Sequence, residues 1–305
     1  MGTPVVEGVV EGVVDRSDAA VLRWAARRVE VTGAPVLVKR RPWSRVWWLP
    51  VPGGRAWLKA CPPAVAHEVA LVAALSARGA PHLLAPLAAD ASRGWLLTPD
   101  GGPTLREALA AAPRGGDPWP AALARYAQLQ RASAPHVGEL LALGVPDARP
   151  PVLADLAAAL VQRRAPHLRG LLPRVADEAA ELAELGPEPT VQHDDLHDGN
   201  VLAAGLRPFD WGDACVGHPF TSLRVGARPG RADGDRAAHL AGWPGAPGVL
   251  QRAADLAVHL GAITRALSWE RALASAEDAG DAVPGGFADA PARWLERLSE
   301  PVGAA

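Results

Sequence analysis

The 305-residue sequence contains only two cysteines, Cys61 and Cys215, which lie far apart and outside any CxxC motif. A disulfide framework or a structural zinc site would need more cysteines, so we interpret both as small buried side chains in a reducing compartment. No apolar run approaches the roughly 18 residues that span a bilayer. Residues 5–14 are interrupted by acids and lack a preceding basic segment, unlike a signal peptide. We therefore expect a cytoplasmic protein that does not bind a membrane.

An excess of charge of either sign is also missing. The chain has 31 Lys and Arg against 33 Asp and Glu, for a formal net charge of −2. A nucleic-acid binder usually carries a clustered basic excess, so no nucleic-acid partner is expected. Lysine is scarce, because only Lys39 and Lys59 are lysines among the 31 basic residues. In a chain that uses arginine as its default cation, each lysine calls for a specific explanation.

The first hundred residues predict a small sheet with helices. Residues 18–29 have helical spacing. A second helix is expected to open at Pro62-Pro63 and to end at Gly79, and the apolar runs 82–88 and 94–97 predict two short strands. Three further segments rich in Val, Leu and Trp are predicted to be antiparallel strands: Val36–Arg40, Val46–Val51 and Arg55–Ala60.

The pattern becomes mostly helical after Asp100. Thr104, followed three residues later by Glu107, predicts a capping box at a helix start. Residues 190–212 predict short strands around polar residues. We therefore expect an α+β fold of two lobes: residues 1–100, with an N-terminal helical extension, and residues 101–305. The other predicted helical segments are Trp119–Ser133, Pro151–Arg163, Val175–Leu185 and the Ala- and Leu-rich tail, Ala237–Leu298.

The highest density of polar side chains lies in residues 193–200, His-Asp-Asp-Leu-His-Asp-Gly-Asn, and an Asp-Trp-Gly sequence begins at Asp210. The spacing H-x-D-L-x-x-x-N followed by D-x-G is typical of the catalytic loop and metal-binding turn of kinases. Asp195 could accept the proton of an attacking hydroxyl, and the oxygens of Asn200 and Asp210 suit Mg²⁺. This reading predicts phosphoryl transfer.

Two alternatives use the same residues differently. A metal-dependent hydrolase would bind a transition metal through His193, His197, Asp195 and Asp210. The two histidines are four residues apart, which suits one helix, but the Asp-Gly pair after His197 argues against a continuous helix. A kinase-shaped protein that only binds ligand is the other alternative, although the loss of a functional residue that usually marks such proteins is not seen.

The upstream region favours phosphoryl transfer. A kinase needs a lysine on the third strand and a glutamate on the following helix. Lys59 ends the third predicted strand, and Glu68 follows nine residues later in the predicted helix. A hydrolase has no use for this pair.

With these residues, the chain resembles the aminoglycoside phosphotransferase-like small-molecule kinases, relatives of choline kinases with a protein-kinase-like fold, over roughly residues 30–270. The resemblance implies that Asp195 is the catalytic base and that Asn200 and Asp210 hold Mg²⁺. It also implies that Lys59 contacts the α- and β-phosphates of ATP or GTP, steadied by Glu68.

The same resemblance places the adenine hinge at residues 97–101, with Thr98 and Asp100 as nucleotide-binding residues. Trp269 and Glu270 lie on a late helix where the family binds its acceptor, which is expected to be a small molecule with a hydroxyl group. The mild charge balance of residues 225–305, ten acids against eight arginines, weakly disfavours polycationic aminoglycosides and leaves a sugar, a nucleoside, an amino alcohol or another metabolite.

Two departures from protein kinases concern the first hairpin and the segment after Asp210. No G-x-G-x-x-G precedes Lys59; the hairpin reads Arg-Pro-Trp-Ser-Arg, so we expect Ser44 and nearby backbone amides to cover the nucleotide. No A-P-E follows Asp210, which favours a small-molecule acceptor. The tryptophans at 43, 47, 48 and 57 are interpreted as packing pairs of a small sheet. Lys39, beside Arg40 and Arg41, is expected to be a surface cation whose exchange for arginine is nearly silent.

Overall fold

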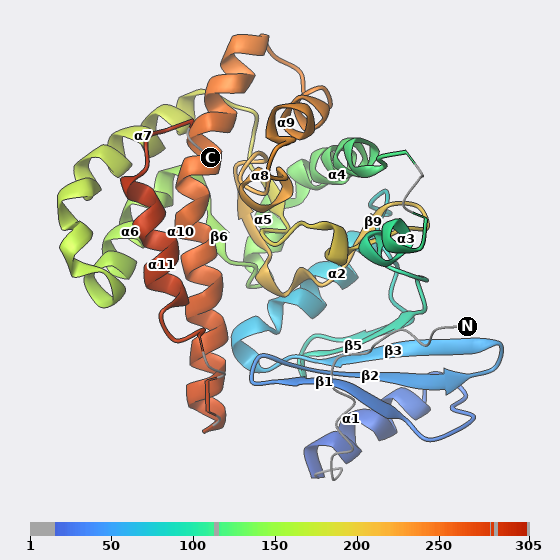
Figure 1. Cartoon of the computed structure of the whole chain (residues 1–305). Helices are drawn as coiled ribbons and strands as arrows, with labels where there is room; N and C mark the ends of the chain where they lie inside the picture. The colour runs from blue at the N-terminus through green and yellow to red at the C-terminus, as the bar shows by residue number, and fades with distance from the viewer. Residues whose placement is uncertain (1–15, 113–115, 281, 284–285, 304–305) are drawn as a thin grey trace.

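The computed structural model describes residues 16–112, 116–280, 282–283 and 286–303, and it has the predicted α+β architecture of two lobes (Figure 1). Residues 5–14, interpreted above as unlike a signal peptide, lie outside these ranges. An antiparallel sheet forms the N-terminal lobe, and helices dominate the C-terminal lobe (Figure 1).

The N-terminal sheet has five antiparallel strands in the order β1-β2-β3-β5-β4. The three predicted strands are confirmed within two residues at each end. Val46 on β2 lies opposite Lys59 on β3, and Lys59 lies opposite Leu96 on β5. The strands are β1 (Val36–Arg41), β2 (Ser44–Val51), β3 (Gly54–Ala60), β4 (Ala88–Asp90) and β5 (Trp95–Pro99).

Helix α1 (Arg16–Ala26) covers the face of the sheet that is turned away from the helical lobe (Figure 1). Trp24 of α1 and Trp47 of β2 are both buried in the core between them, so the packing interpretation is confirmed for Trp47. The helix ends three residues earlier than predicted, at Ala26, where Arg28 Nη1 donates to the carbonyl oxygen of Trp24 at 2.9 Å and satisfies a terminal acceptor of the helix.

Helix α2 (His67–Ala77) lies on the opposite face of the sheet, toward the helical lobe (Figure 1). The predicted helix therefore exists, but its prolines open a 3₁₀ turn, η1 (Pro63–Val65), rather than the α-helix itself. Because α2 begins at His67, Glu68 lies in its first turn.

The predicted strand over residues 82–88 is wrong, since only Ala88 belongs to a strand. His82 has a φ of 58°, which is incompatible with extended backbone, and Pro81 and Pro86 cannot donate to a sheet. The strand predicted at 94–97 is confirmed as β5.

The C-terminal lobe confirms the predicted helices with shifted ends. Thr104 caps α3 in the predicted capping box with Glu107. The α-helices of this lobe are α3 (Leu105–Ala111), α4 (Trp119–Ser133), α5 (Val137–Ala142), α6 (Pro150–Arg164), α7 (Leu172–Glu184), α8 (Leu223–Gly226), α9 (Ala232–Leu240), α10 (Pro247–Ala279) and α11 (Ala290–Glu296). Its 3₁₀ helices are η2 (Ala134–His136), η3 (Pro166–Leu171), η4 (Asp198–Asn200), η5 (Trp211–Asp213) and η6 (Arg297–Ser299).

Two small sheets interrupt the helices, and three of their five strands lie within residues 190–212, where short strands are predicted. One has the strand order β6-β10-β7, and the other pairs β8 with β9. Their strands are β6 (Asp147–Ala148), β7 (Thr190–Gln192), β8 (Val201–Leu202), β9 (Arg207–Pro208) and β10 (Cys215–Gly217).

The link between the lobes runs from the end of β5 at Pro99 to the start of α3 at Leu105. A boundary at residue 100 stays a prediction. Both cysteines, Cys61 and Cys215, are buried and form no disulfide. Of the helices that the structure describes, none has the length and apolar character needed to cross a bilayer.

Candidate active site

The polar loop that follows β7 is held next to Asp210 by a short hairpin. The strands β8 and β9 pair Val201 with Pro208, and the amide of Phe209 donates to the carbonyl oxygen of Asn200 at 3.0 Å. Because this hydrogen bond ties the residue before Asp210 to Asn200, the two predicted magnesium ligands are brought to the same place from ten residues apart.

Asp195 lies in this loop among donors. Its carboxylate is 3.1 Å from Arg265 Nη2, accepts from Asn200 Nδ2 at 3.1 Å and is 3.6 Å from His197 Nε2. Burial opposes ionisation, but the nearby His197 and the charge of Arg265 hold the pKa of Asp195 below its usual value. The side chain is therefore an ionised carboxylate, which is able to accept a proton.

Lys59 joins the two lobes through a buried charge cluster. Its ammonium lies 2.6 Å from Glu68 Oε2 and 2.5 Å from Asp210 Oδ1. Burial would lower the pKa of Lys59, but Asp210 and Glu68 raise it well above its ordinary value. Glu68 also accepts from the amide of Trp211 at 3.1 Å, so α2 is fixed to the turn that carries Asp210.

Asp210 adopts a left-handed backbone conformation, with a φ of 63°. This region is unfavourable for most side chains and is kept where surrounding contacts impose it. Burial alone would raise the pKa of Asp210, but the charges of Lys59 and Lys39 hold it well below its ordinary value. The turn therefore presents a carboxylate to the cleft.

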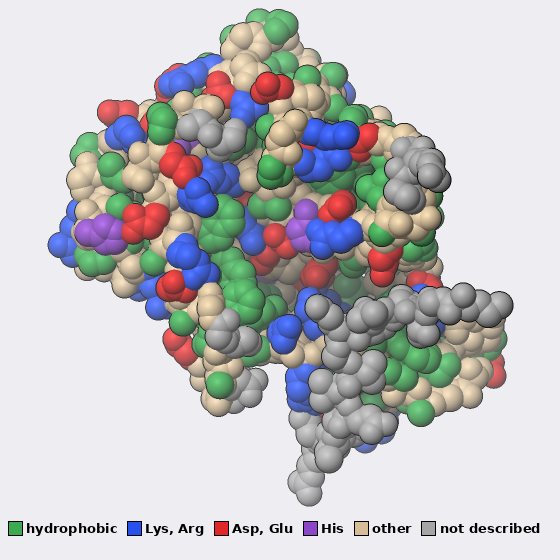
Figure 2. Space-filling view, in the orientation of Figure 1, with side chains coloured by type: hydrophobic (Ala, Val, Ile, Leu, Met, Phe, Trp, Pro, Cys, Tyr) green, Lys and Arg blue, Asp and Glu red, His purple; other side chains and the backbone are tan. Residues whose placement is uncertain are grey.

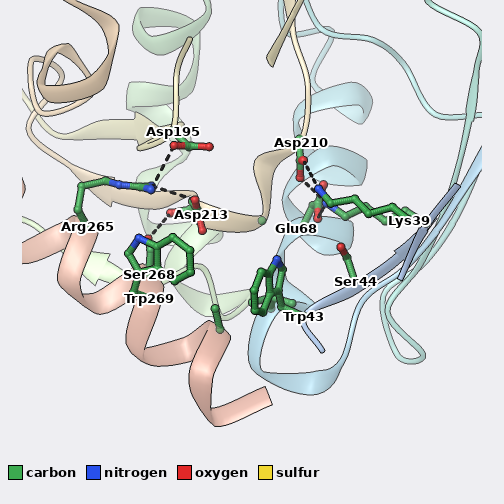
Figure 3. Close-up of a pocket in the computed structure, with 14 residues that line it drawn as sticks. Lys39, Trp43, Ser44, Glu68, Asp195, Asp210, Asp213, Arg265, Ser268 and Trp269 are labelled. Carbon is green, nitrogen blue, oxygen red and sulfur yellow. Dashed lines mark hydrogen bonds and ion pairs between the residues drawn. The ribbon is translucent and has the colours of Figure 1, made fainter. Parts of the chain in front are cut away.

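These side chains line a cavity of about 210 Å³ between the lobes (Figure 3). Figure 2 shows acidic and basic side chains gathered in the hollow between the helical part and the sheet. Six of the predicted site residues line the cavity: Ser44, Lys59, Glu68, Asp195, Asp210 and Trp269. Asn200 is not in its wall but contacts Asp195 directly.

Three of the predicted site residues lie elsewhere. Thr98 pairs with Trp57 in the sheet. Asp100 accepts from Arg55 Nε at 2.7 Å and from the amide of Gly102 at 3.1 Å. Glu270 is ion-paired with Arg163 and Arg164 at 3.1 and 2.7 Å, away from the cavity, so this geometry gives no support to an acceptor-binding role for Glu270.

Other cavity residues were not predicted from the sequence. Arg265 Nη1 lies 2.9 Å from both Asp213 Oδ2 and the carbonyl oxygen of Asp194. Nothing in the local sequence marks Arg265, because it reaches the loop from α10, far along the chain. Trp43 lies in the cavity wall and meets Trp269 edge to face at 5.9 Å, so the sheet-packing interpretation does not hold for Trp43.

Lys39 also lines the cavity, which corrects the expectation of an ordinary surface cation. Its ammonium lies 4.0 Å from Asp210 Oδ2. Both lysines of the chain therefore face the same carboxylate.

The two histidines of the hydrolase alternative, His193 and His197, each have a ring nitrogen in contact with the backbone. His193 Nε2 lies 2.7 Å from the carbonyl oxygen of Phe209, and its ring packs on Trp211. His197 Nδ1 accepts from the amide of Gly199 at 3.0 Å. Within the described ranges, no three His, Cys, Asp or Glu side chains are grouped so as to hold a metal ion. This geometry does not support the hydrolase alternative.

Solved structures with the same fold belong to several small-molecule phosphotransferases. A choline/ethanolamine kinase family protein from Mesorhizobium loti is 19% identical, with 93% of this chain and 95% of that chain covered and a TM-score of 0.60. A GDP complex of an aminoglycoside 2'-phosphotransferase is 13% identical, with 92% and 96% covered and a TM-score of 0.61. A macrolide 2'-phosphotransferase from Brachybacterium faecium is 19% identical, with 93% and 99% covered and a TM-score of 0.55.

Sequence comparison gives a family rather than an individual relative. No curated protein is similar enough in sequence to count as a match. The model of the phosphotransferase enzyme family matches residues 40–243, a range that includes Lys59, Glu68, Asp195, Asn200 and Asp210 and covers more than half of the chain. The chain therefore belongs to the phosphotransferase enzyme family.

Proposed function

We propose that this protein transfers the γ-phosphoryl group of a nucleoside triphosphate, ATP or GTP, to a hydroxyl group of a small molecule. One observation carries the proposal: a buried lysine lies between a helix glutamate and the aspartate of a D-x-G turn, in the same cavity as an ionised loop aspartate. This is the set of groups that phosphoryl transfer requires.

The residues around Asp210 fit a magnesium ion. Asn200 and Asp210 offer oxygen donors, which Mg²⁺ prefers. The side-chain amide nitrogen of Asn200 donates to Asp195, so the side-chain oxygen of Asn200 points away from Asp195. When bound, Mg²⁺ would neutralise charge on the β- and γ-phosphates.

Each side chain has a defined part in this proposal. Lys59, fixed by Glu68, binds the α- and β-phosphates, and the buried Ser44, at the start of β2, lines the cavity beside it. Asp195 accepts the proton of the acceptor hydroxyl as its oxygen attacks phosphorus, and Arg265 and Asn200 orient the carboxylate. Such general-base assistance contributes roughly 10²–10⁴-fold to rate.

The nucleotide base is assigned to residues 97–101. The side chain of Asp100 is occupied by Arg55 and by the amide of Gly102, so the backbone of this segment, rather than the Asp100 carboxylate, is the part that can face a base. A Cβ added to Gly101 would come 2.3 Å from Leu202 Cδ1. The segment is therefore packed tightly on the loop that carries the catalytic residues.

The charges of the cavity favour an acceptor without multiple positive charges. Asp195 and Asp213 are both paired with Arg265, and Asp210 and Glu68 are paired with Lys59. A polycationic acceptor needs carboxylates that are not already paired with a cation of the protein. Trp43 and Trp269 instead give the acceptor side an aromatic wall, which suits the apolar face of a sugar ring or a similar neutral group.

The test is a screen of hydroxyl-containing metabolites and antibiotics for acceptor-dependent release of ADP or GDP in the presence of Mg²⁺. We expect release with at least one neutral acceptor, and phosphorylated product by mass spectrometry. Nucleotide binding without turnover on any acceptor would favour a protein that only binds ligand. Hydrolysis that depends on a transition metal and needs no nucleotide would favour the hydrolase.

A further inference from the structure

The two lysines of the chain converge on one carboxylate from two different strands. Lys59 on β3 lies 2.5 Å from Asp210 Oδ1, and Lys39 on β1 lies 4.0 Å from Asp210 Oδ2. Every other basic residue except histidine is an arginine. An ammonium is a compact point donor, whereas a guanidinium is a wide planar fork. Both compact donors of the chain therefore lie beside the carboxylate of Asp210.

A β-bulge aims Lys39 at the cleft. The register of β1 against β2 shifts between Leu37 and Lys39. Leu37 packs into the core on the α1 side of the sheet, and without the bulge Lys39, two residues later, would share that face. Bulges commonly redirect a side chain next to an active site.

The neighbours of Lys39 confirm which way it points. The next residue, Arg40, donates to Asp18 of α1 at 2.6 Å, so it lies on the α1 face. Lys39 is paired with Val46, and Val46 is paired with Lys59. Lys39, Val46 and Lys59 therefore lie in one row of side chains across the cleft face of the sheet.

The hairpin between β1 and β2 lacks the glycine-rich backbone that usually binds terminal phosphates in kinases. Only Pro42 and Trp43 lie between the two strands. Proline has no amide hydrogen, and the hairpin has none of the glycines that let backbone amides approach a phosphate closely. A cation in this position can supply the donors that such a loop would provide.

The ammonium of Lys39 is available to donate hydrogen bonds to a phosphate. At 4.0 Å from Asp210, its ammonium is too distant for a hydrogen bond to that carboxylate. Its side chain is 46% exposed, against 16% for Lys59. Lys59 is thus fixed within the cluster, whereas Lys39 extends over the cavity with its N–H donors not used by Asp210.

We propose that Lys39 binds the terminal phosphates of the nucleoside triphosphate, in place of the backbone amides of a glycine-rich loop. The proposal rests on the proposed function and assigns the two lysines different phosphates, because Lys39 lies nearer to the hairpin tip and Lys59 deeper in the cleft. Two donors along one polyphosphate chain would also hold the γ-phosphate facing Asp195.

The test compares the affinities of Lys39→Met for three Mg²⁺ complexes by titration calorimetry: ATP or GTP, the matching diphosphate, and inorganic tripolyphosphate. The matched control is Arg40→Met, which removes the same charge from the other face of β1. A hydrogen bond to a charged group is commonly worth about tenfold in affinity or more. We expect Lys39→Met to lose roughly tenfold for the triphosphate and tripolyphosphate and less than threefold for the diphosphate. Lys39→Arg should recover part of the loss.

The outcomes separate this proposal from the function on which it rests. If wild-type protein binds nucleotide and Lys39→Met binds triphosphate equally well, the Lys39 proposal is wrong and the proposed function stands. An equal loss for diphosphate and triphosphate would also overturn the assignment to the terminal phosphates, and a matching loss in Arg40→Met would reduce the effect to general charge. Wild-type protein that binds none of the three ligands would overturn both proposals. Thermal unfolding of each variant checks that it is folded.

Discussion

At the scale of single residues, the two central aspartates have different partners. Asp195 faces Arg265 and Asn200, whereas Asp210 faces the two lysines of the chain. An ionised carboxylate has about four acceptor sites, so Asp195 can accept a proton while Arg265 and Asn200 orient it, whereas a metal ligand must offer its charge to cations. The different partners therefore support different roles for two residues of the same type.

Exchanging each aspartate for asparagine tests this division. Asp195→Asn removes the proton acceptor, so turnover is expected to fall about 10²–10⁴-fold while nucleotide affinity survives. Asp210→Asn removes charge that Mg²⁺ needs, so nucleotide affinity in the presence of Mg²⁺ is expected to fall. Acceptor-dependent turnover and nucleotide titrations provide the two measurements. Equal losses of nucleotide binding in both variants would contradict the assignment.

The geometry around Lys59 predicts that arginine cannot replace it. The ammonium lies 2.6 Å from Glu68 and 2.5 Å from Asp210 in a buried cluster, a geometry that suits a compact point donor rather than a wide planar guanidinium. Lys59→Arg should lower turnover roughly a hundredfold, the usual scale for losing one donor to developing charge, and nearly as far as Lys59→Ala.

Lys39→Arg is not a suitable control for that experiment, because Lys39 lines the same cavity. The reverse exchange at Arg78, which pairs with Glu139 on the surface at 2.8 Å, is a better one. Arg78→Lys should leave turnover unchanged. Near wild-type turnover in Lys59→Arg would remove the main support that the N-terminal lobe gives to the kinase mechanism.

At the scale of elements, helix α10 holds the catalytic loop through a buried acid that the mechanism does not use. Asp194 lies 2.6 Å from Thr264 Oγ1 and 3.3 Å from Ser268 Oγ. Thr264 Oγ1 also lies 3.0 Å from the carbonyl oxygen of Gly261. Both hydroxyls donate to the Asp194 carboxylate. The hydrogen bond from Thr264 lowers the pKa of Asp194, but burial of the carboxylate raises it by more.

The burial of Asp194 makes the stability of the folded chain depend on pH. Burial raises the pKa of Asp194 to about 7 from the ordinary 3.8. The folded state then holds a proton that the unfolded state has lost, so the stabilisation is present at low pH and disappears as the pH rises through about 7. Asp194→Asn cannot titrate, and the wild-type protein should lose about 2 kcal/mol relative to it between pH 5 and pH 7.

Urea unfolding of both proteins at pH 5, 6 and 7 measures this difference. Parallel pH profiles for the two would show that Asp194 is ionised throughout this range. Thr264→Ser keeps the hydroxyl that faces Asp194 and should keep the wild-type profile.

At the scale of the whole molecule, the cavity lies between two lobes, so a ligand that bridges them should stabilise the folded chain. A ligand that binds only the folded state at a hundredfold excess over its dissociation constant adds about 2.7 kcal/mol. We expect Mg²⁺ with ATP or GTP to raise the midpoint of thermal unfolding by a few degrees. No shift with either nucleotide, together with a shift on Zn²⁺ or Mn²⁺ alone, would point to the hydrolase instead.

Much of this architecture could be predicted from local sequence. Period-two and helical patterns predicted β1, β2 and β3 and helices such as α4, because both depend on residues close in the chain. The spacing from His193 to Asp210 predicted the functional loop for the same reason. The strand predicted at 82–88 failed where the two prolines and the left-handed His82 prevented pairing.

The sequence by itself determined the elements, the family resemblance and the identity of the main polar residues of the site. Tertiary structure decided which side chains reach the cavity. Trp269 lines it while Glu270 pairs with Arg163 and Arg164 on α6, because consecutive residues on a helix point about 100° apart. Lys39 reaches Asp210 because a bulge turns it from the α1 face of the sheet to the cleft, and Arg265 reaches Asp195 because α10 packs beside the loop. Register and helix rotation are set by packing between distant segments, which no local pattern contains.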